Sequence, residues 1–161
     1  MAGPCGCGAG QERLEHEGIR ETMTVHTQHV TIDTHGDNDM HDITDELRDA
    51  LQKSGCQHGL VNVFVRHTTA AIIIGEYEPG LIHDIPIAVE RIAPATGNYR
   101  HNALNHDDNA HSHLVGSIMG PSETVPFSNG KLMLGTWQQV ILLELDTHPR
   151  RRDIVIQITG E

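Results

Sequence analysis

Two short apolar runs that lie close together in the sequence constrain the fold more than any other feature. Residues 60–65 and 70–74 consist almost entirely of valine, isoleucine and other apolar side chains. Each run is too short and too uniformly apolar for an amphipathic helix, so both are predicted to be central strands. Because the segment between them joins two core strands, its polar side chains should lie at the end or the edge of the core. These polar residues are Arg66, His67, Thr68 and Thr69.

The rest of the chain alternates between β-branched runs and segments with helical periodicity. Strands are predicted for residues 19–32, 124–127, 131–134, 138–145 and 153–159, and helices for residues 42–51, 79–92 and 109–119. About eight strands and three helices around one core predict a single α+β domain, with mixed or antiparallel sheets that form a sandwich or a partly closed barrel. Residues 19–161 are assigned to this domain. Residues 1–18, with Cys5 and Cys7 among glycines, are predicted to be a flexible tail.

Charge and cysteine content narrow the classes of function. The 161 residues include 22 acidic and 11 basic side chains, a formal net charge of −11. Such a balance disfavours non-specific binding to nucleic acid or anionic lipid, so any anionic ligand needs a local pocket. No run approaches about 20 apolar residues, so no membrane span is expected. Three cysteines cannot all pair within one chain, which favours a reducing, cytoplasmic compartment.

Histidines supply the densest group of potential ligands. The chain has 13 of them, and residues 99–113 hold four histidines and two aspartates, a donor set suited to zinc, manganese or a related divalent ion. On a helix, His111 and His113 would project about 200° apart. We therefore favour His113 together with His101 from the preceding loop, and leave His106 and His111 open. The alternative is a hydrophilic loop whose histidines cap the helix and face water.

Several residues outside this group are further candidates. His67 lies between core strands, where it is either a functional group or a core histidine bonded to the backbone. Glu76 and Asp84 lie near the ends of apolar segments, where a carboxylate could bind a metal, orient an imidazole or cap a helix. Glu144 interrupts an apolar strand and needs a partner. Residues 150–152, three arginines, could pair with Glu144 and Asp146 or could hold a phosphate.

Taken in chain order, these motifs form a specific series that spans residues 23–161. The series is His67-Thr68-Thr69-Ala70, Glu76, Asp84, Tyr99-Arg100-His101, Asn109-Ala110-His111-Ser112-His113-Leu114, Gly120-Pro121-Ser122, Gly130-Lys131-Leu132, Leu134-Gly135-Thr136-Trp137-Gln138, Glu144, Asp146 and Arg150 to Arg152. It resembles the YjbQ family. Two departures stand out: the spacing from His101 to Asn109 is longer than in many relatives, and many relatives have an acidic residue at the position of His111.

The resemblance implies a small cytoplasmic homotrimer with histidine-lined pockets that can hold a metal ion. It also implies a secondary thiamine-phosphate synthase activity, which joins a pyrimidine diphosphate to a thiazole phosphate and releases pyrophosphate. Zinc is the first expectation for the ion, with magnesium or manganese as alternatives, and the substrate is expected to be a small phosphorylated molecule. The alternatives are a metal-dependent phosphate-ester hydrolase and a non-catalytic protein that binds metal or small anions. On this basis the expected metal ligands are His67, His101 and His113, the catalytic residues His67, Glu76, Asp84 and Arg151, and the cofactor-binding residues Thr68, Trp137 and Gln138.

Overall fold

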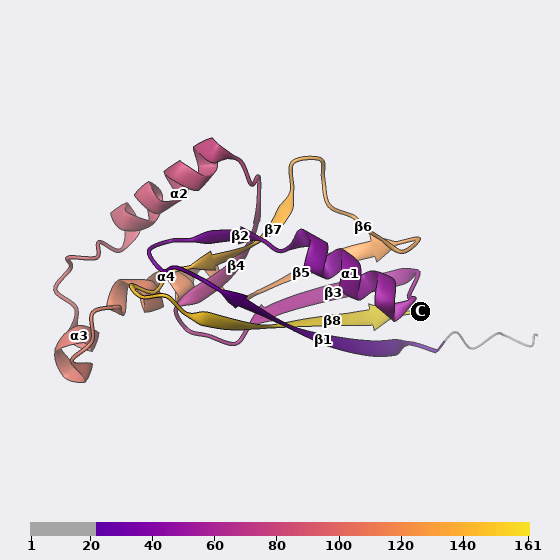
Figure 1. Ribbon diagram of the computed structural model, residues 1–161, viewed down its shortest axis with the longest axis horizontal. Coiled ribbons are helices and arrows are strands. Elements are labelled where there is room, and N and C mark those ends of the chain that lie inside the picture. The colour runs from indigo at the N-terminus through magenta and orange to yellow at the C-terminus, as the bar shows by residue number, and fades with distance from the viewer. Residues whose placement is uncertain (1–21) are drawn as a thin grey trace, which may run out of the picture.

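The computed structural model describes residues 22–161, which form eight strands and four helices (Figure 1). The strands are β1 (Thr24–Asp33), β2 (Met40–Asp42), β3 (His58–Val65), β4 (Ala70–Gly75), β5 (Ser122–Ser128), β6 (Lys131–Leu132), β7 (Gln139–Glu144) and β8 (Arg151–Gly160). The helices are α1 (Thr44–Ser54), α2 (Pro79–Ile92), α3 (Arg100–Asn105) and α4 (Ala110–Met119). The predicted tail, with Cys5 and Cys7, lies outside the described residues.

The strands form two antiparallel sheets. One sheet has five strands in the order β1-β8-β3-β5-β6, and the other has three in the order β2-β7-β4. The sheets curl into a half-barrel, with α1 against the core between them and with α2 and α4 on the other side of the three-stranded sheet (Figure 1). The predicted α+β class is therefore confirmed.

Strands β4 and β7 of the three-stranded sheet pack against core residues on both faces, which explains why they are almost uniformly apolar. In β7, Val140 and Leu142 point into the core shared with α1 and the five-stranded sheet, whereas Ile141 and Leu143 point into the core below α2 and α4. Strand β3 is different, because Val61, Val63 and Val65 are fully buried while Leu60 and Phe64 on the outward face are exposed. A strand with one covered face alternates in this way.

The helices were predicted correctly where the periodic segment was long and had capping residues at its ends. Helix α2 has the predicted bounds, including an internal Pro86, and α1 ends at Gly55, whose φ of 73° suits a glycine. Two elements were missed: β2 has three residues and α3 has six, too few for a period to be recognised. Within residues 22–161, no helix is both long and apolar enough to cross a membrane.

Candidate functional site

A polar cleft of about 340 Å³ opens at the end of the three-stranded sheet. Three parts of the chain build it: the segment between β3 and β4, the beginning of α4, and the turn from β7 into β8. Its walls combine imidazole, hydroxyl, amide, carboxylate and guanidinium groups. The lining residues are His67, Thr68, Thr69, Asn109, His113, Asp146, Arg150, Arg151 and Arg152.

A buried ion pair forms the floor of this cleft. The Arg152 guanidinium donates through Nε to Glu144 at 2.6 Å and through an Nη to the other carboxylate oxygen, and both side chains are almost completely buried. Glu144 also accepts from the Thr34 hydroxyl at 2.6 Å and from the Asp146 backbone N–H at 2.8 Å. Arg152 donates further to the carbonyl and the hydroxyl of Thr69. Each buried charge is compensated by the other charge and by hydrogen bonds. Removal of either side chain would therefore leave the other charge buried without its partner.

A second ion pair continues the same wall. Asp146 is 2% exposed and accepts from Arg150 Nε at 2.9 Å and from the Thr69 hydroxyl at 2.9 Å. Burial alone would raise the pKa of Asp146, but the bonds from Arg150 and Thr69 and the charge of Arg152 outweigh it and lower the pKa to about 2. The pairing of Glu144 and Asp146 with the arginine cluster, one of the two predicted alternatives, is therefore confirmed.

Arg151 is the remaining cation of the cleft. Its two neighbours in the sequence are engaged with carboxylates, whereas Arg151 is exposed and has no carboxylate partner among residues 22–161. A guanidinium without a counter-charge is free to donate several hydrogen bonds to an anionic ligand. Arg151 is thus the arginine best able to bind a phosphate group.

His67 presents a hydrogen-bond donor rather than a free lone pair. Its Nε2 accepts from the backbone N–H of Asp153 at 3.0 Å, so in the neutral ring Nδ1 carries the proton. Burial lowers the pKa of His67, and the nearby charge of Arg152 lowers it further, against the opposing charge of Asp153. The ring is therefore neutral at pH 7, with the proton on Nδ1 and with Nε2 accepting the hydrogen bond from Asp153.

A glycine brings α4 against the segment that carries His67. A Cβ at Gly116 would lie only 2.9 Å from the carbonyl oxygen of Thr68, closer than side chains approach a backbone. The helix can therefore pack directly on this segment, which sets the first turn of α4 beside the cleft. His113 and Asn109 reach the cleft from that turn.

His101 and His113 form a pair at the junction of α3 and α4. Their ring centroids are 4.7 Å apart, with the planes tilted by 49°. Burial lowers the pKa of His113, and the neighbouring His101 lowers it further, against the charges of Asp107 and Asp146. The Nδ2 of Asn105, which can only donate, lies 3.2 Å from His101 Nδ1. The neutral His101 ring therefore carries its proton on Nε2.

Three buried polar atoms of α3, α4 and the residue before α4 have no hydrogen-bond partner among the described residues. They are Nε2 of His101, Oδ1 of Asn109 and Nδ1 of His111. Asn109 occupies the N-cap position of α4, as its sequence suggests, but its side chain makes no capping bond. Unpaired buried polar atoms are costly and rare in folded proteins, and of these three residues only Asn109 lines the cleft, so its Oδ1 is the unpaired atom that a ligand in the cleft could satisfy.

Only some of the expected metal ligands lie close together. His101 and His113 are neighbours, and His113 and His67 line one cleft. However, no three His, Cys, Asp or Glu side chains of residues 22–161 are arranged so that they could hold a metal ion. The reason for His67 is chemical, because neither of its nitrogens has a lone pair left for a metal while Nε2 accepts from Asp153. The described residues thus offer two imidazoles rather than three.

Four predicted site residues lie away from the cleft. Glu76 follows β4 and is half-buried, and Asp84 is exposed on α2, where it contacts His83. Trp137, 69% exposed, and Gln138 lie in the segment between β6 and β7. None of the four lines the cleft of this chain, whereas the predicted Thr68 and Arg151 do.

Sequence reasoning did not assign a site role to Thr69 or Asn109. Thr69 was part of a noted motif, but its hydroxyl joins both ion pairs only because β4 places it next to β7 and β8. Asn109 looks like an ordinary helix cap in the sequence. Its unpaired Oδ1 is visible only in three dimensions.

Comparison with known proteins gives a consistent result. The family profile described as UPF0047 protein YjbQ-like matches residues 28–161. A UPF0047 protein of Methanothermobacter thermautotrophicus is 42% identical over 139 residues, which cover 86% of this chain and 95% of the relative. A crystal structure of a YbjQ-like protein of unknown function from Sulfolobus solfataricus matches with a TM-score of 0.83 and 36% identity, covering 87% of this chain and 100% of that chain. A hypothetical protein from Aeropyrum pernix matches with a TM-score of 0.80 and 36% identity, covering 84% and 99%.

Proposed function

The chain belongs to the YjbQ-like UPF0047 family, and from this premise we propose that its cleft binds a phosphorylated small molecule and transfers an organic group with release of pyrophosphate. The reaction class is that of a secondary thiamine-phosphate synthase. One observation carries the proposal: the cleft is lined both by Asn109, whose buried Oδ1 has no hydrogen-bond partner among residues 22–161, and by Arg151, a guanidinium without a counter-charge there. A ligand with phosphate oxygens and polar ring atoms would satisfy both sides.

The donors and acceptors of the cleft are divided in a way that suits such a ligand. Arg151 and the Nδ1–H of His67 would donate to phosphate oxygens, which carry most of the ligand's charge. On the other wall, Oδ1 of Asn109 would accept from an N–H or O–H group of the organic part. Arg150 and Arg152 are committed to carboxylates and hold the wall in place.

The proposed step is a displacement at carbon. The ring nitrogen of the thiazole phosphate forms a bond to the carbon that carries the diphosphate, and the carbon–oxygen bond to the diphosphate breaks. The bonding electrons leave with pyrophosphate, so no oxidant and no net proton transfer are needed. The contribution of Arg151 and His67 is to donate to the departing oxygens, where negative charge develops in the transition state.

We propose separately that a divalent ion binds at the histidine pair beside the cleft. His101 and His113 suit it, because they are neighbouring imidazoles and an unpaired Nε2 is available on His101. Ligation through that Nε2 would require the His101 proton to move to Nδ1 and the Asn105 amide to turn its oxygen toward it. Zinc, or magnesium or manganese in its place, would supply positive charge beside the cleft when bound. Metal analysis of protein purified without nickel affinity tests this.

An assay with both substrates tests the proposed reaction. Protein incubated with the pyrimidine diphosphate and the thiazole phosphate should form thiamine phosphate and pyrophosphate in equal amounts, measured by chromatography. Arg151→Gln should lower the rate about 100-fold, the usual effect of removing one donor to a developing charge. Arg91→Gln, an exposed arginine on α2, is the matched control and should leave it unchanged. Release of inorganic phosphate instead would favour the hydrolase, and binding without turnover the non-catalytic protein.

We propose in addition that the chain is a homotrimer. The number of subunits comes from the family resemblance, and the support from this chain is the outer face of the five-stranded sheet. There Leu60 and Phe64 are 50% and 39% exposed, although they lie on a central strand. Light scattering should give the mass of three chains, and Leu60→Lys should lower it. A monomer with full ligand affinity would remove the subunit interface from the account.

A further inference from the structure

A second pocket of the molecule is separate from the cleft. It is a groove of about 710 Å³ between α1 and the segment that runs from β6 to β7. None of the cleft residues line it. Its lining residues are Arg48, Leu51, Gln52, Gly130, Lys131, Leu132, Leu134, Gly135, Thr136, Gln138 and Gln139.

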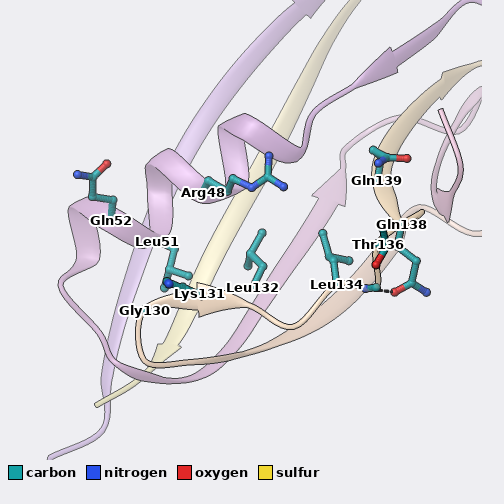
Figure 2. Close-up of a pocket in the computed structure, with 11 residues that line it drawn as sticks. Arg48, Leu51, Gln52, Gly130, Lys131, Leu132, Leu134, Thr136, Gln138 and Gln139 are labelled. Atoms are coloured by element: carbon teal, nitrogen blue, oxygen red, sulfur yellow. Dashed lines mark hydrogen bonds between the residues drawn. The ribbon is translucent and has the colours of Figure 1, made fainter. Parts of the chain in front are cut away.

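The bottom of this groove is apolar. Leu51 is buried in α1, and Leu132 and Leu134 are half-buried against the core. Figure 2 shows these three leucines between α1 and the segment that follows β6, with Arg48 on the α1 side and Gln138 and Gln139 at the far end. A ligand in the groove would therefore rest on leucine side chains, which favours an apolar body.

The rim has the opposite charge to the chain as a whole. Acidic residues outnumber basic ones two to one, 22 to 11, yet the lining contains two basic residues and no acidic residue. Lys131 is exposed and has no carboxylate partner among residues 22–161. Arg48 contacts Asp45 through one Nη at 2.7 Å, which leaves its other donors available. Positive charge above an apolar floor in an acidic protein indicates an anionic ligand.

Two glutamines add oriented donors. The Oε1 of Gln138 accepts from the Gly135 N–H at 2.8 Å, and the Oε1 of Gln139 accepts from the Tyr77 N–H at 2.9 Å. With their oxygens held by the backbone, both side chains have amide N–H groups left to donate. Gly135 and Gln138 also bond in the reverse direction, from Gln138 N–H to the Gly135 carbonyl, so this turn is fixed before any ligand binds.

We propose that this groove is a binding site for a small amphipathic organic anion, with its apolar body on the three leucines and its anionic group beside Lys131 and Arg48. The groove shares no lining residue with the cleft, although it includes Gln138, one of the residues that the family resemblance implies for cofactor binding. Carboxylates and phosphates share this chemistry, and competition between them identifies the preferred anionic group.

A matched pair of dyes tests the proposal. Anilinonaphthalene sulfonate carries an apolar ring system and one negative charge, and N-phenylnaphthylamine is its uncharged analogue. The folded, full-length chain should bind the anionic dye saturably and more tightly than the neutral one. In the double variant Arg48→Gln with Lys131→Gln, the dissociation constant of the anionic dye should rise about fivefold, because exposed charge pairs are individually weak. Affinity for the neutral dye should stay the same.

Controls separate this groove from other apolar surfaces. The double variant Arg91→Gln with Lys53→Gln removes the same two charges from exposed positions outside the lining and should leave both affinities unchanged. In amide NMR spectra, the signals of Gly130, Gly135 and the Gln138 side chain should shift on titration. Displacement of the dye by benzoate or phenyl phosphate then ranks the two anionic groups. The proposal is overturned if neither competes, if the anionic dye does not saturate, or if the shifts fall on other parts of the chain.

Discussion

The β7–β8 wall of the cleft and the α3–α4 region beside the cleft differ in how their buried polar atoms are satisfied. On the β7–β8 wall, Glu144 and Asp146 are almost fully buried, and each accepts at least three hydrogen bonds or ion-pair contacts from named partners. In the α3–α4 region, His101, Asn109 and His111 each keep one buried polar atom without a partner in the described chain, and of these residues Asn109 lines the cleft. The buried carboxylates of the charged β7–β8 wall are paired, whereas the neutral α3–α4 region keeps buried atoms without a hydrogen-bond partner in the described chain.

This difference indicates which wall maintains the fold and which one binds. A buried charge network that is fully paired resists rearrangement, because breaking any single contact leaves a charge without compensation. Unpaired neutral atoms cost less and are satisfied when a ligand arrives. We therefore assign stability to the charged β7–β8 wall, and ligand binding to Asn109 and His113 together with Arg151.

Removal of the buried arginine should give the largest effect. Arg152→Met keeps the length of the side chain but leaves Glu144 buried without its partner, so the free energy of unfolding should fall by about 3–5 kcal/mol. Arg151→Met, one residue earlier and exposed, is the control and should change stability by less than about 0.5 kcal/mol. Denaturant titration of both variants measures this. A loss below about 1 kcal/mol for Arg152→Met would show that the charged wall does not maintain the fold.

A change at Asp146 should have the next largest effect and a distinct pH dependence. Asp146→Asn removes the charge that Arg150 and Thr69 stabilise, so stability at pH 7 should fall by about 1–3 kcal/mol. The pKa of Asp146 is about 2 in the folded chain, below its ordinary value of 3.8. Its contribution is therefore present above pH 4 and is lost as pH falls from about 4 through 2.

Unfolding curves recorded at several pH values test this prediction. The difference in stability between wild type and Asp146→Asn should be constant above pH 4 and should shrink below it. A difference that stays the same down to pH 2 would mean that the carboxylate of Asp146 is not stabilised in the folded state.

The smallest effect is expected at Asn109, where we predict almost no loss of stability on substitution. Asn109→Ala should change stability by less than about 0.5 kcal/mol, because the side chain makes no capping bond. Glu78→Ala is the matched control at the N-cap of α2, where the carboxylate accepts from two backbone N–H groups, and it should cost about 1 kcal/mol. Equal losses in thermal unfolding of the two variants would mean that Asn109 has a structural role after all.

Much of the fold followed from local pattern. The apolar runs at residues 60–65 and 70–74 became β3 and β4, and the periodicity of residues 79–92 became α2, because burial on one or both faces leaves a readable period. The family resemblance from the ordered motifs is likewise confirmed. The segments that failed were β2 and α3, which are too short to contain a period.

The candidate site was only partly predictable, because its chemistry depends on contacts between distant segments. His67 was expected to be either a metal ligand or a core histidine bonded to the backbone, and its Nε2 accepts from a backbone N–H of β8, 86 residues later in the chain. Trp137 and Gln138 were expected beside the histidines, but the fold of one chain puts them between β6 and β7. No local pattern reports either arrangement.

Nitrogen NMR of the imidazole rings at pH 7, without and with inorganic pyrophosphate, tests the central claim most directly, because it identifies the protonated nitrogen of each ring. Before the addition, the account predicts a proton on Nδ1 of His67 and on Nε2 of His101. Pyrophosphate should then shift the His67, His101 and His113 signals saturably and leave exposed His26 unchanged. Saturable binding that moves none of these three rings would contradict the assignment of the cleft as the ligand site.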